Sequence, residues 1–189
     1  MTHTHFLDVA KITLHPFCGT LGVSPRTQGP QDVMPPGHFG GNLDCPALGV
    51  GSALWLPVEV PGALFSAGDP HAAQGHGEVA GTAIECPMSV TLEFILHHGV
   101  ALKTPQYLAP SLPAQPSTRT FGVVGVGPDL MEAARDAIRG ILDYIIHEYR
   151  IEPVEAYILA SIIVDLRIAQ VVNTPQWTVT ATRPLDGLR

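Results

Sequence analysis

The sequence has no cluster of basic side chains, no long apolar run and few charges of either sign. Its ten Lys and Arg residues are scattered, and the net charge is −7. A nucleic-acid-binding surface needs grouped cations to neutralise phosphates, so no nucleic acid partner is expected. No stretch reaches the roughly 18 apolar residues of a membrane span, and the N-terminus lacks the basic start and apolar core of a signal peptide. We therefore expect a soluble cytoplasmic protein with no membrane partner.

Charged residues make up only 14% of the chain, against 46% hydrophobic residues. So few charged side chains can hydrate only a small part of the surface. We therefore expect a homo-oligomer, a dimer or larger, in which part of that surface is covered. The three cysteines, Cys18, Cys45 and Cys86, form no C-x-x-C pair. An odd, dispersed set fits a reducing compartment better than a disulfide framework.

The first two thirds of the chain, residues 1–127, is predicted to be β-rich. Short extended runs bounded by Gly and Pro cover Phe6–Leu14, Ala53–Val60, Gly62–Ala67, Val90–His97 and Phe121–Val126. In the run from Val90 to His97, apolar and polar residues alternate with the period of a half-buried strand, and Ile95 is the one apolar residue on the polar face. Stretches 25–41 and 108–117, rich in Pro and Gly, are predicted loops.

The C-terminal third changes to a helical pattern over residues 128–173. One helix is predicted from Pro128 to about Tyr149 and a second from Pro153 to about Val172, followed by a closing strand at 176–182. The run GVVGVG before the first helix fits neither dinucleotide-binding nor Walker spacing, and is interpreted as a strand-to-helix turn that needs small residues. Strands first and helices later predict one α+β domain over residues 1–189.

Several candidate ligands stand among glycines in the nearly uncharged segment from His38 to Glu85. Asn42 and Asp44 are two residues apart, as are Asp69 and His71, and residues so spaced in an extended segment point to one side. Buried carboxylates are costly unless they are paired or bound to a cation. Two such pairs with Glu85 would offer oxygen and imidazole ligands, a mixture that suits zinc, manganese or calcium. Such an ion can polarise a carbonyl and lower the pKa of a bound water.

Several motifs resemble the acetamidase/formamidase family. They are HPFCGTLGVSP, HFGGNLD, LPVEVPGALFSAGDPHAAQGHGE, GTAIE and EAYILASIIVDLRIAQVVN, which extend from about Leu14 to about Asn173. The resemblance implies metal-dependent hydrolysis of short linear amides to a carboxylate and ammonia, on a swivelling β/β/α-type fold. It also implies that Asn42, Asp44, Asp69, His71 and Glu85 occupy the ligand and catalytic positions of the family. We expect all five to be metal ligands, with zinc the leading cation and calcium a candidate second one.

The remaining roles are expectations by position. Glu85 and Glu78 are the candidates to move the proton, and His38 and His76 the candidates to contact the substrate, with a surface-loop role the alternative for both histidines. His76 stands where the family motif QGDGE has Asp. This replacement could alter a hydrogen bond that orients a metal ligand, or a second cation site. The family also carries a further β-rich portion before the matching segment, and a partner chain is one way to supply it.

Two alternatives remain open at this stage. The first is a non-catalytic, metal-binding oligomeric fragment, or one subunit of a split amidase. The second is an amidase with a cysteine nucleophile, either Cys45 or Cys86, in which Lys11 or Lys103 would be the accompanying lysine. Small buried thiols are the simpler interpretation of these cysteines.

Overall fold

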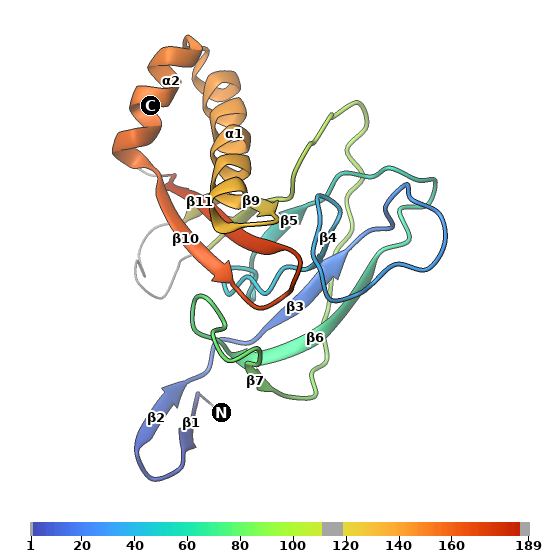
Figure 1. Ribbon diagram of the computed structural model, residues 1–189, viewed down its shortest axis with the longest axis vertical. Coiled ribbons are helices and arrows are strands. Elements are labelled where there is room, and N and C mark those ends of the chain that lie inside the picture. Colours follow the sequence, from blue (N-terminus) through green and yellow to red (C-terminus); the bar gives the residue numbers. More distant parts are fainter. Residues whose placement is uncertain (1, 111–118, 186–189) are drawn as a thin grey trace.

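Two antiparallel sheets and two helices form the fold of the computed structural model, which describes residues 2–110 and 119–185 (Figure 1). The four-stranded sheet has the order β4 (Gly40–Asn42), β3 (Phe17–Gly22), β6 (Ser66–Ala73), β7 (Ile84–Glu85). The five-stranded sheet has the order β10 (Asp165–Gln170), β11 (Trp177–Pro184), β9 (Thr120–Gly127), β8 (Gln106–Ala109), β5 (Ala53–Trp55). A hairpin of β1 (His3–Phe6) and β2 (Ala10–Thr13) projects from this body.

The sheets and helices stack in three layers, and the central five-stranded sheet contributes to two cores. One core lies between the sheets and includes Leu43, Tyr107 and Val124. The other lies between the five-stranded sheet and the helices, where Val123 of β9 meets Ile141 of α1. Neighbouring residues of a strand point to opposite faces, so the apolar run of β9 serves both cores. The α+β prediction is confirmed.

Helix α1 (Leu130–Tyr149) begins and ends close to the predicted bounds. The Asp129 side chain caps it by accepting hydrogen bonds from the backbone N–H groups of Met131 and Glu132. The helix lies directly on β9, because a Cβ added to Gly125 would be only 2.1 Å from the carbonyl oxygen of Ala133. The glycines of GVVGVG therefore belong to a strand that a helix covers. No helix in the described residues has the length and apolar content to cross a bilayer.

The second helix was predicted too long. Helix α2 (Pro153–Ile163) ends where β10 begins, and β10 pairs with β11 as the edge of the five-stranded sheet. The predicted helical tail 128–173 is therefore wrong after Ile163. Helix α2 is apolar on all sides, with Val154 and Ile162 exposed, so no apolar stripe marked its end. The closing strand is confirmed as β11.

Other predicted strands are confirmed only in part. The run Phe6–Leu14 is interrupted by the turn between β1 and β2, and only residues 53–55 of the run Ala53–Val60 form a strand. Residues 66–67 of Gly62–Ala67 begin β6, and residues 62–64 form a turn. Val90–His97 lies outside the sheets. Of the predicted loop 108–117, residues 108–109 belong to β8, and residues 111–117 lie outside the described residues.

Candidate metal centre

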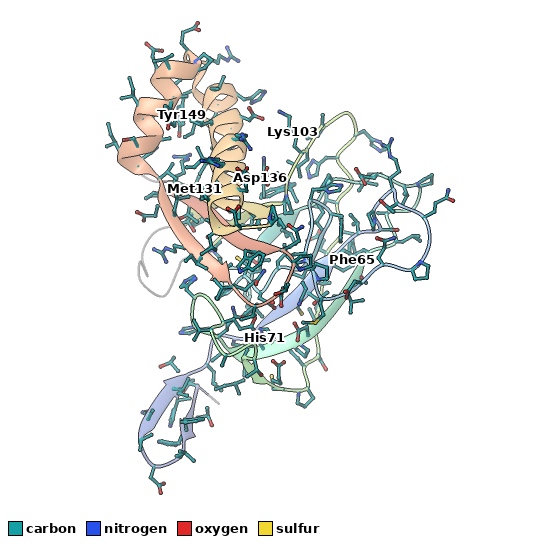
Figure 2. The ribbon with its side chains drawn as sticks, in the orientation of Figure 1. Phe65, His71, Lys103, Met131, Asp136 and Tyr149 are labelled. Atoms are coloured by element: carbon teal, nitrogen blue, oxygen red, sulfur yellow. The ribbon has the colours of Figure 1, made fainter. Side chains whose placement is uncertain are left out.

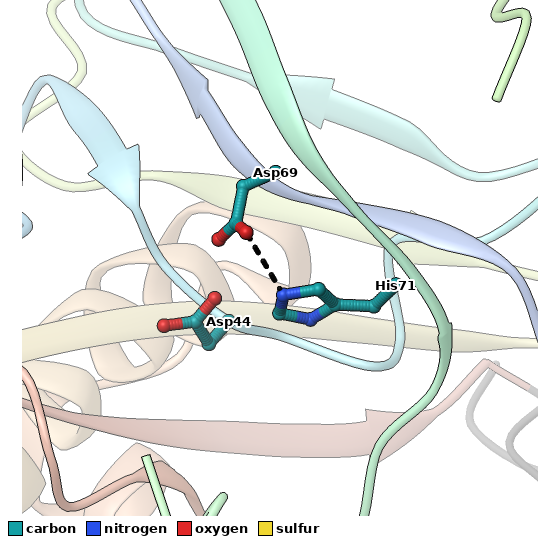
Figure 3. Close-up of side chains that lie close together, drawn as sticks. All are labelled: Asp44, Asp69 and His71. Atoms are coloured by element: carbon teal, nitrogen blue, oxygen red, sulfur yellow. Dashed lines mark ion pairs between the residues drawn. The ribbon is translucent and has the colours of Figure 1, made fainter. Parts of the chain in front are cut away.

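Four acidic side chains surround the imidazole of His71, which is buried at the end of β6 where that strand pairs with β7 (Figure 2). Its Nε2 atom lies 3.1 Å from Oδ1 of Asp69 and 3.4 Å from Oε1 of Glu85. Asp44, Asp69 and His71 offer ligand atoms within 4.8 Å of one another, and so do His71, Glu78 and Glu85. Figure 3 shows Asp44 and Asp69 beside the ring. The fold thus brings together most of the side chains predicted to form the site.

The backbone of β3 forms the floor of this cluster. The carbonyl oxygen of Gly19 accepts hydrogen bonds from the N–H groups of Leu43 and Asp44, which holds the turn after β4 against β3. A Cβ added to Gly19 would lie 2.5 Å from Oδ1 of Asp44 and 2.6 Å from Oδ2 of Asp69. Only glycine leaves room for both carboxylates. Gly19 lies within the motif HPFCGTLGVSP, but it was not among the predicted site residues.

Gln74 fixes which nitrogen of His71 carries a proton. The Gln74 Nε2 group donates to the carbonyl oxygens of Asp44 (2.8 Å) and Ala169 (3.3 Å), so its Oε1 atom must be the acceptor that faces His71 Nδ1 at 2.8 Å. An amide oxygen accepts only from a protonated nitrogen, so Nδ1 carries hydrogen. Phe17 packs edge-on against the ring. Gln74 was not among the sequence-predicted site residues, because its orientation depends on carbonyl oxygens 30 and 95 residues away in the sequence.

With Nδ1 protonated, neutral His71 directs the lone pair of Nε2 toward the carboxylates of Asp69 and Glu85. That arrangement is repulsive unless a proton or a cation lies between them. Burial lowers the pKa of His71, but the hydrogen bond with Gln74 and the charges of Asp69 and Glu85 outweigh it, and the net pKa is raised. A positive charge is therefore required at Nε2, and either an imidazolium proton or a metal ion supplies it.

Asp44 and Glu78 form the buried side of the cluster. Oδ2 of Asp44 accepts a hydrogen bond from Asn173, whereas its buried Oδ1 has no partner among the described residues. Burial raises the pKa of Asp44, and the hydrogen bond from Asn173 opposes that rise. Burial and the charge of Asp44 raise the pKa of Glu78 to about 7. Two buried carboxyls this close share a proton or a cation.

The donor set fits a divalent cation. It combines Nε2 of an imidazole that carries its proton on Nδ1 with carboxylate oxygens, one of which is buried with no N–H donor among the described residues. Carboxylate and imidazole ligands suit zinc or manganese better than a metal ion that prefers thiolates. A hydrogen bond from the distal ring nitrogen, such as that between His71 and Gln74, usually accompanies metal ligation by histidine.

Three predicted residues occupy other positions. The amide of Asn42 is engaged away from His71, accepting from Thr20 and donating to the carbonyl oxygen of Met34. The left-handed φ of Asp44, 43°, takes that residue out of strand geometry, so the two-residue spacing does not place Asn42 beside it. His38 lies 3.1 Å from Glu59 and lines a cavity of about 370 Å³ that none of the His71 cluster borders. His76 is exposed in its loop.

The cysteines lack the setting of a nucleophile. Cys45 is buried, and burial raises the pKa of its thiol to about 12, whereas a reactive cysteine needs a lowered pKa. Cys86 is directed at the carbonyl oxygen of Pro70. Lys103 pairs with Asp143 on the surface of α1. The structure thus gives no support to the cysteine alternative.

Comparison with known proteins gives a consistent result. A model of the acetamidase/formamidase family matches residues 24–188. A suggested formamidase of Schizosaccharomyces pombe is 30% identical over 182 residues, which are 88% of this chain and 44% of that protein. A predicted acetamidase/formamidase of Thermoanaerobacter tengcongensis superimposes with a TM-score of 0.86 at 27% identity, covering 97% of this chain and 57% of the other. An acetamidase of Yersinia enterocolitica superimposes with a TM-score of 0.83 at 29% identity, covering 97% of this chain and 52% of the other. The chain spans about half the length of these relatives.

Proposed function

The chain belongs to the acetamidase/formamidase family, and from this membership we propose that it hydrolyses short linear amides of formamide or acetamide size to a carboxylate and ammonia. The proposal includes a divalent cation, zinc first, held by Asp44, Asp69, His71 and Glu85. The observation that carries it is the convergence of carboxylate oxygens on Nε2 of His71, together with the buried Oδ1 of Asp44, for which the described residues supply no N–H donor. Bound there, a divalent cation would polarise the amide carbonyl and make a water more acidic.

The residues around the cation site divide into holding groups and a proton carrier. Gln74 fixes the ring of His71, and Asn173 holds Asp44 from the opposite side. Glu78 is the better proton carrier of the two predicted glutamates, because it is buried against Asp44, whereas the side chain of Glu85 is 51% exposed. A carboxyl that titrates near neutrality can accept a proton from water and give it to the departing ammonia.

The first test measures metal content and activity on one sample. The purified chain is analysed for bound metals and assayed for ammonia release from formamide and acetamide, before and after chelation and metal return. Stoichiometric metal with chelator-sensitive turnover is the expected result. A Glu78→Gln variant should keep the metal and lose about 10²- to 10⁴-fold in kcat, and Glu148→Gln, at an exposed position of α1, is the matched control. Turnover that survives complete metal removal would refute the metal requirement.

A second candidate function is a metal-binding subunit that does not turn over amides by itself. The observation that favours it is length, since the chain covers only 44% of the S. pombe relative and 52% of the Yersinia acetamidase. A family member can need residues from the uncovered part to complete its substrate pocket. Stoichiometric metal without ammonia release would support this candidate and contradict the first.

A further inference from the structure

Gln170 is a fully buried amide at the end of β10, and its side chain makes four hydrogen bonds within the turn that leads into β11. Its Oε1 atom accepts from the backbone N–H groups of Val172 (2.8 Å) and Asn173 (2.9 Å). Its Nε2 atom donates to the carbonyl oxygen of Gln176 (3.1 Å) and to Oγ1 of Thr178 (2.9 Å). One side chain thus joins both limbs of the turn and fixes where Asn173 lies.

The turn places the side chain of Asn173 against Asp44, which belongs to the segment after β4. The Nδ2 group of Asn173 donates to the carbonyl oxygen of Asn42 (3.1 Å) and to Oδ2 of Asp44 (2.5 Å). A carbonyl oxygen only accepts, so the amide faces these two atoms with its nitrogen. The other oxygen of Asp44, Oδ1, lies over Gly19, where Oδ2 of Asp69 also lies. Asn173 therefore directs Oδ1 of Asp44 toward the proposed cation position.

The backbone on either side of Gln170 also holds the loop between β6 and β7, which lies beside the end of β10 in Figure 1. The carbonyl oxygen of Ala169 accepts from the N–H group of Gly77 (2.9 Å), and the N–H group of Val171 donates to the carbonyl oxygen of Gly77 (3.0 Å). Glu78, the proposed proton carrier, is the next residue of that loop. The end of β10 is therefore anchored to the cluster while its turn reaches Asp44.

We propose that Gln170 is a positioning residue of the metal centre, which acts on Asp44 through the turn and Asn173. This role rests on the proposed function and adds to it a group that contacts neither the cation nor the substrate. Without the Gln170 amide, the N–H groups of Val172 and Asn173 lose their acceptor, and the turn loses its link to β11. Asn173 would then no longer fix which oxygen of Asp44 is directed at the cation.

A purely structural role for Gln170 predicts a different result. A buried amide with all of these hydrogen bonds stabilises the fold whether or not it affects the site, so lower stability in Gln170→Leu is expected in both cases. The zinc affinity of the folded protein separates them. Thr182→Val is the matched control, because it removes the hydroxyl that donates to the carbonyl oxygen of Asp165 at the far end of the same strand pair and leaves the turn intact.

Calorimetric titration with Zn²⁺ tests the route from Gln170 to the site. Gln170→Leu and Asn173→Ala should each lower zinc affinity by about 10- to 100-fold, as removal of a partner behind a metal ligand does. The double variant should bind no more weakly than the weaker single variant, because both changes act on Asp44 by one route. Thr182→Val should bind zinc like the wild type. Wild-type affinity in Gln170→Leu, or two effects that add, would overturn the proposal.

Hydrogen exchange in the metal-free wild-type chain tests the same route without zinc and without a substitution that could unfold the protein. If Gln170 fixes the turn, its Nε2 protons and the Nδ2 protons of Asn173 are released by one opening and should be equally protected in ¹⁵N NMR. Fast exchange at Asn173 beside a protected Gln170 would overturn the proposal. A wild-type chain that binds no zinc would refute the metal site of the proposed function, while equal protection would still support the role of Gln170 in orienting Asp44.

Discussion

Replacing Gln74 by leucine tests the core of the site without touching a proposed ligand. Leucine has a similar size but no polar atoms. The change removes the acceptor for Nδ1–H of His71 and the donor to the carbonyl oxygens of Asp44 and Ala169. The ring of His71 would lose the contact that assigns its tautomer. The substitution should therefore weaken both the fold and the affinity for a cation.

The size of the effect follows from the bonds lost. The two bonds of 2.8 Å are the strong ones, and the imidazole is almost fully buried. An ordinary net hydrogen bond contributes about 0.5–1.5 kcal/mol, and a buried group left without its partner costs about 1–3 kcal/mol. Together these values give a loss of about 2–4 kcal/mol in the free energy of unfolding. Removing the partner of a metal-bound histidine lowers metal affinity by about 10- to 100-fold.

Three measurements separate these effects. Denaturant unfolding reports stability, calorimetric titration with Zn²⁺ reports affinity, and ¹⁵N NMR of the metal-free protein reports which ring nitrogen of His71 is protonated. Gln74→Glu keeps an acceptor for Nδ1–H and should retain the tautomer while losing the carbonyl contacts. Gln31→Leu, at an exposed position, is the matched control and should change none of the three values. Wild-type tautomer and wild-type zinc affinity in Gln74→Leu would refute this account of the site.

Two further predictions concern the floor and the thiols. Gly19→Ala should displace a carboxylate, which should cost about 1–3 kcal/mol of stability and lower zinc affinity by tenfold or more. Gly68 has open space around its Cβ position, so Gly68→Ala should change neither value in the same denaturant and zinc titrations. Equal zinc affinities in the two variants would contradict the tight contact at Gly19. Cys45 should resist iodoacetamide at pH 9 in the folded protein while half-buried Cys86 reacts, because the folded pKa of Cys45 is about 12. Since that pKa lies above the unfolded value, the unfolded chain releases the proton first, and this thiol should reduce stability as pH rises from about 9 toward 12. Rapid labelling of native Cys45, seen by peptide mass analysis, would exclude the burial on which this rests.

The ends of α1 and the strand β9 could be predicted from sequence because their signals are local. Asp129 caps the helix two residues after Gly127, and the apolar run of β9 is too short for a helix and is bounded by glycines. The end of α2 could not be predicted, because α2 is apolar all round and β10 follows it without a break signal. Pairing with β11 decides that residues 165–170 form a strand, and pairing is a long-range contact.

The segment from Val90 to His97 illustrates the opposite case. Its alternation of apolar and polar residues predicts a strand, but it pairs with no other strand among the described residues. Alternation of apolar and polar side chains indicates which face of an extended segment is covered. Assignment as a strand also requires hydrogen bonds to a neighbouring strand, which the alternation does not report.

The sequence by itself determined the inventory of the site: the carboxylates and histidine stand among glycines in a nearly uncharged segment, and burial of such groups demands a counter-charge. Only the tertiary structure decided which of them meet. Asn173 is 129 residues from Asp44 in sequence, and Gly19 reaches Asp44 and Asp69 only because β3 lies between β4 and β6. The tautomer of His71 depends on Gln74, and the orientation of Gln74 is set by two carbonyl oxygens from distant segments. The sequence specifies which residue types are present. The distances between them, the tautomer of His71 and the burial of the carboxylates depend on contacts between segments that meet only when the chain folds.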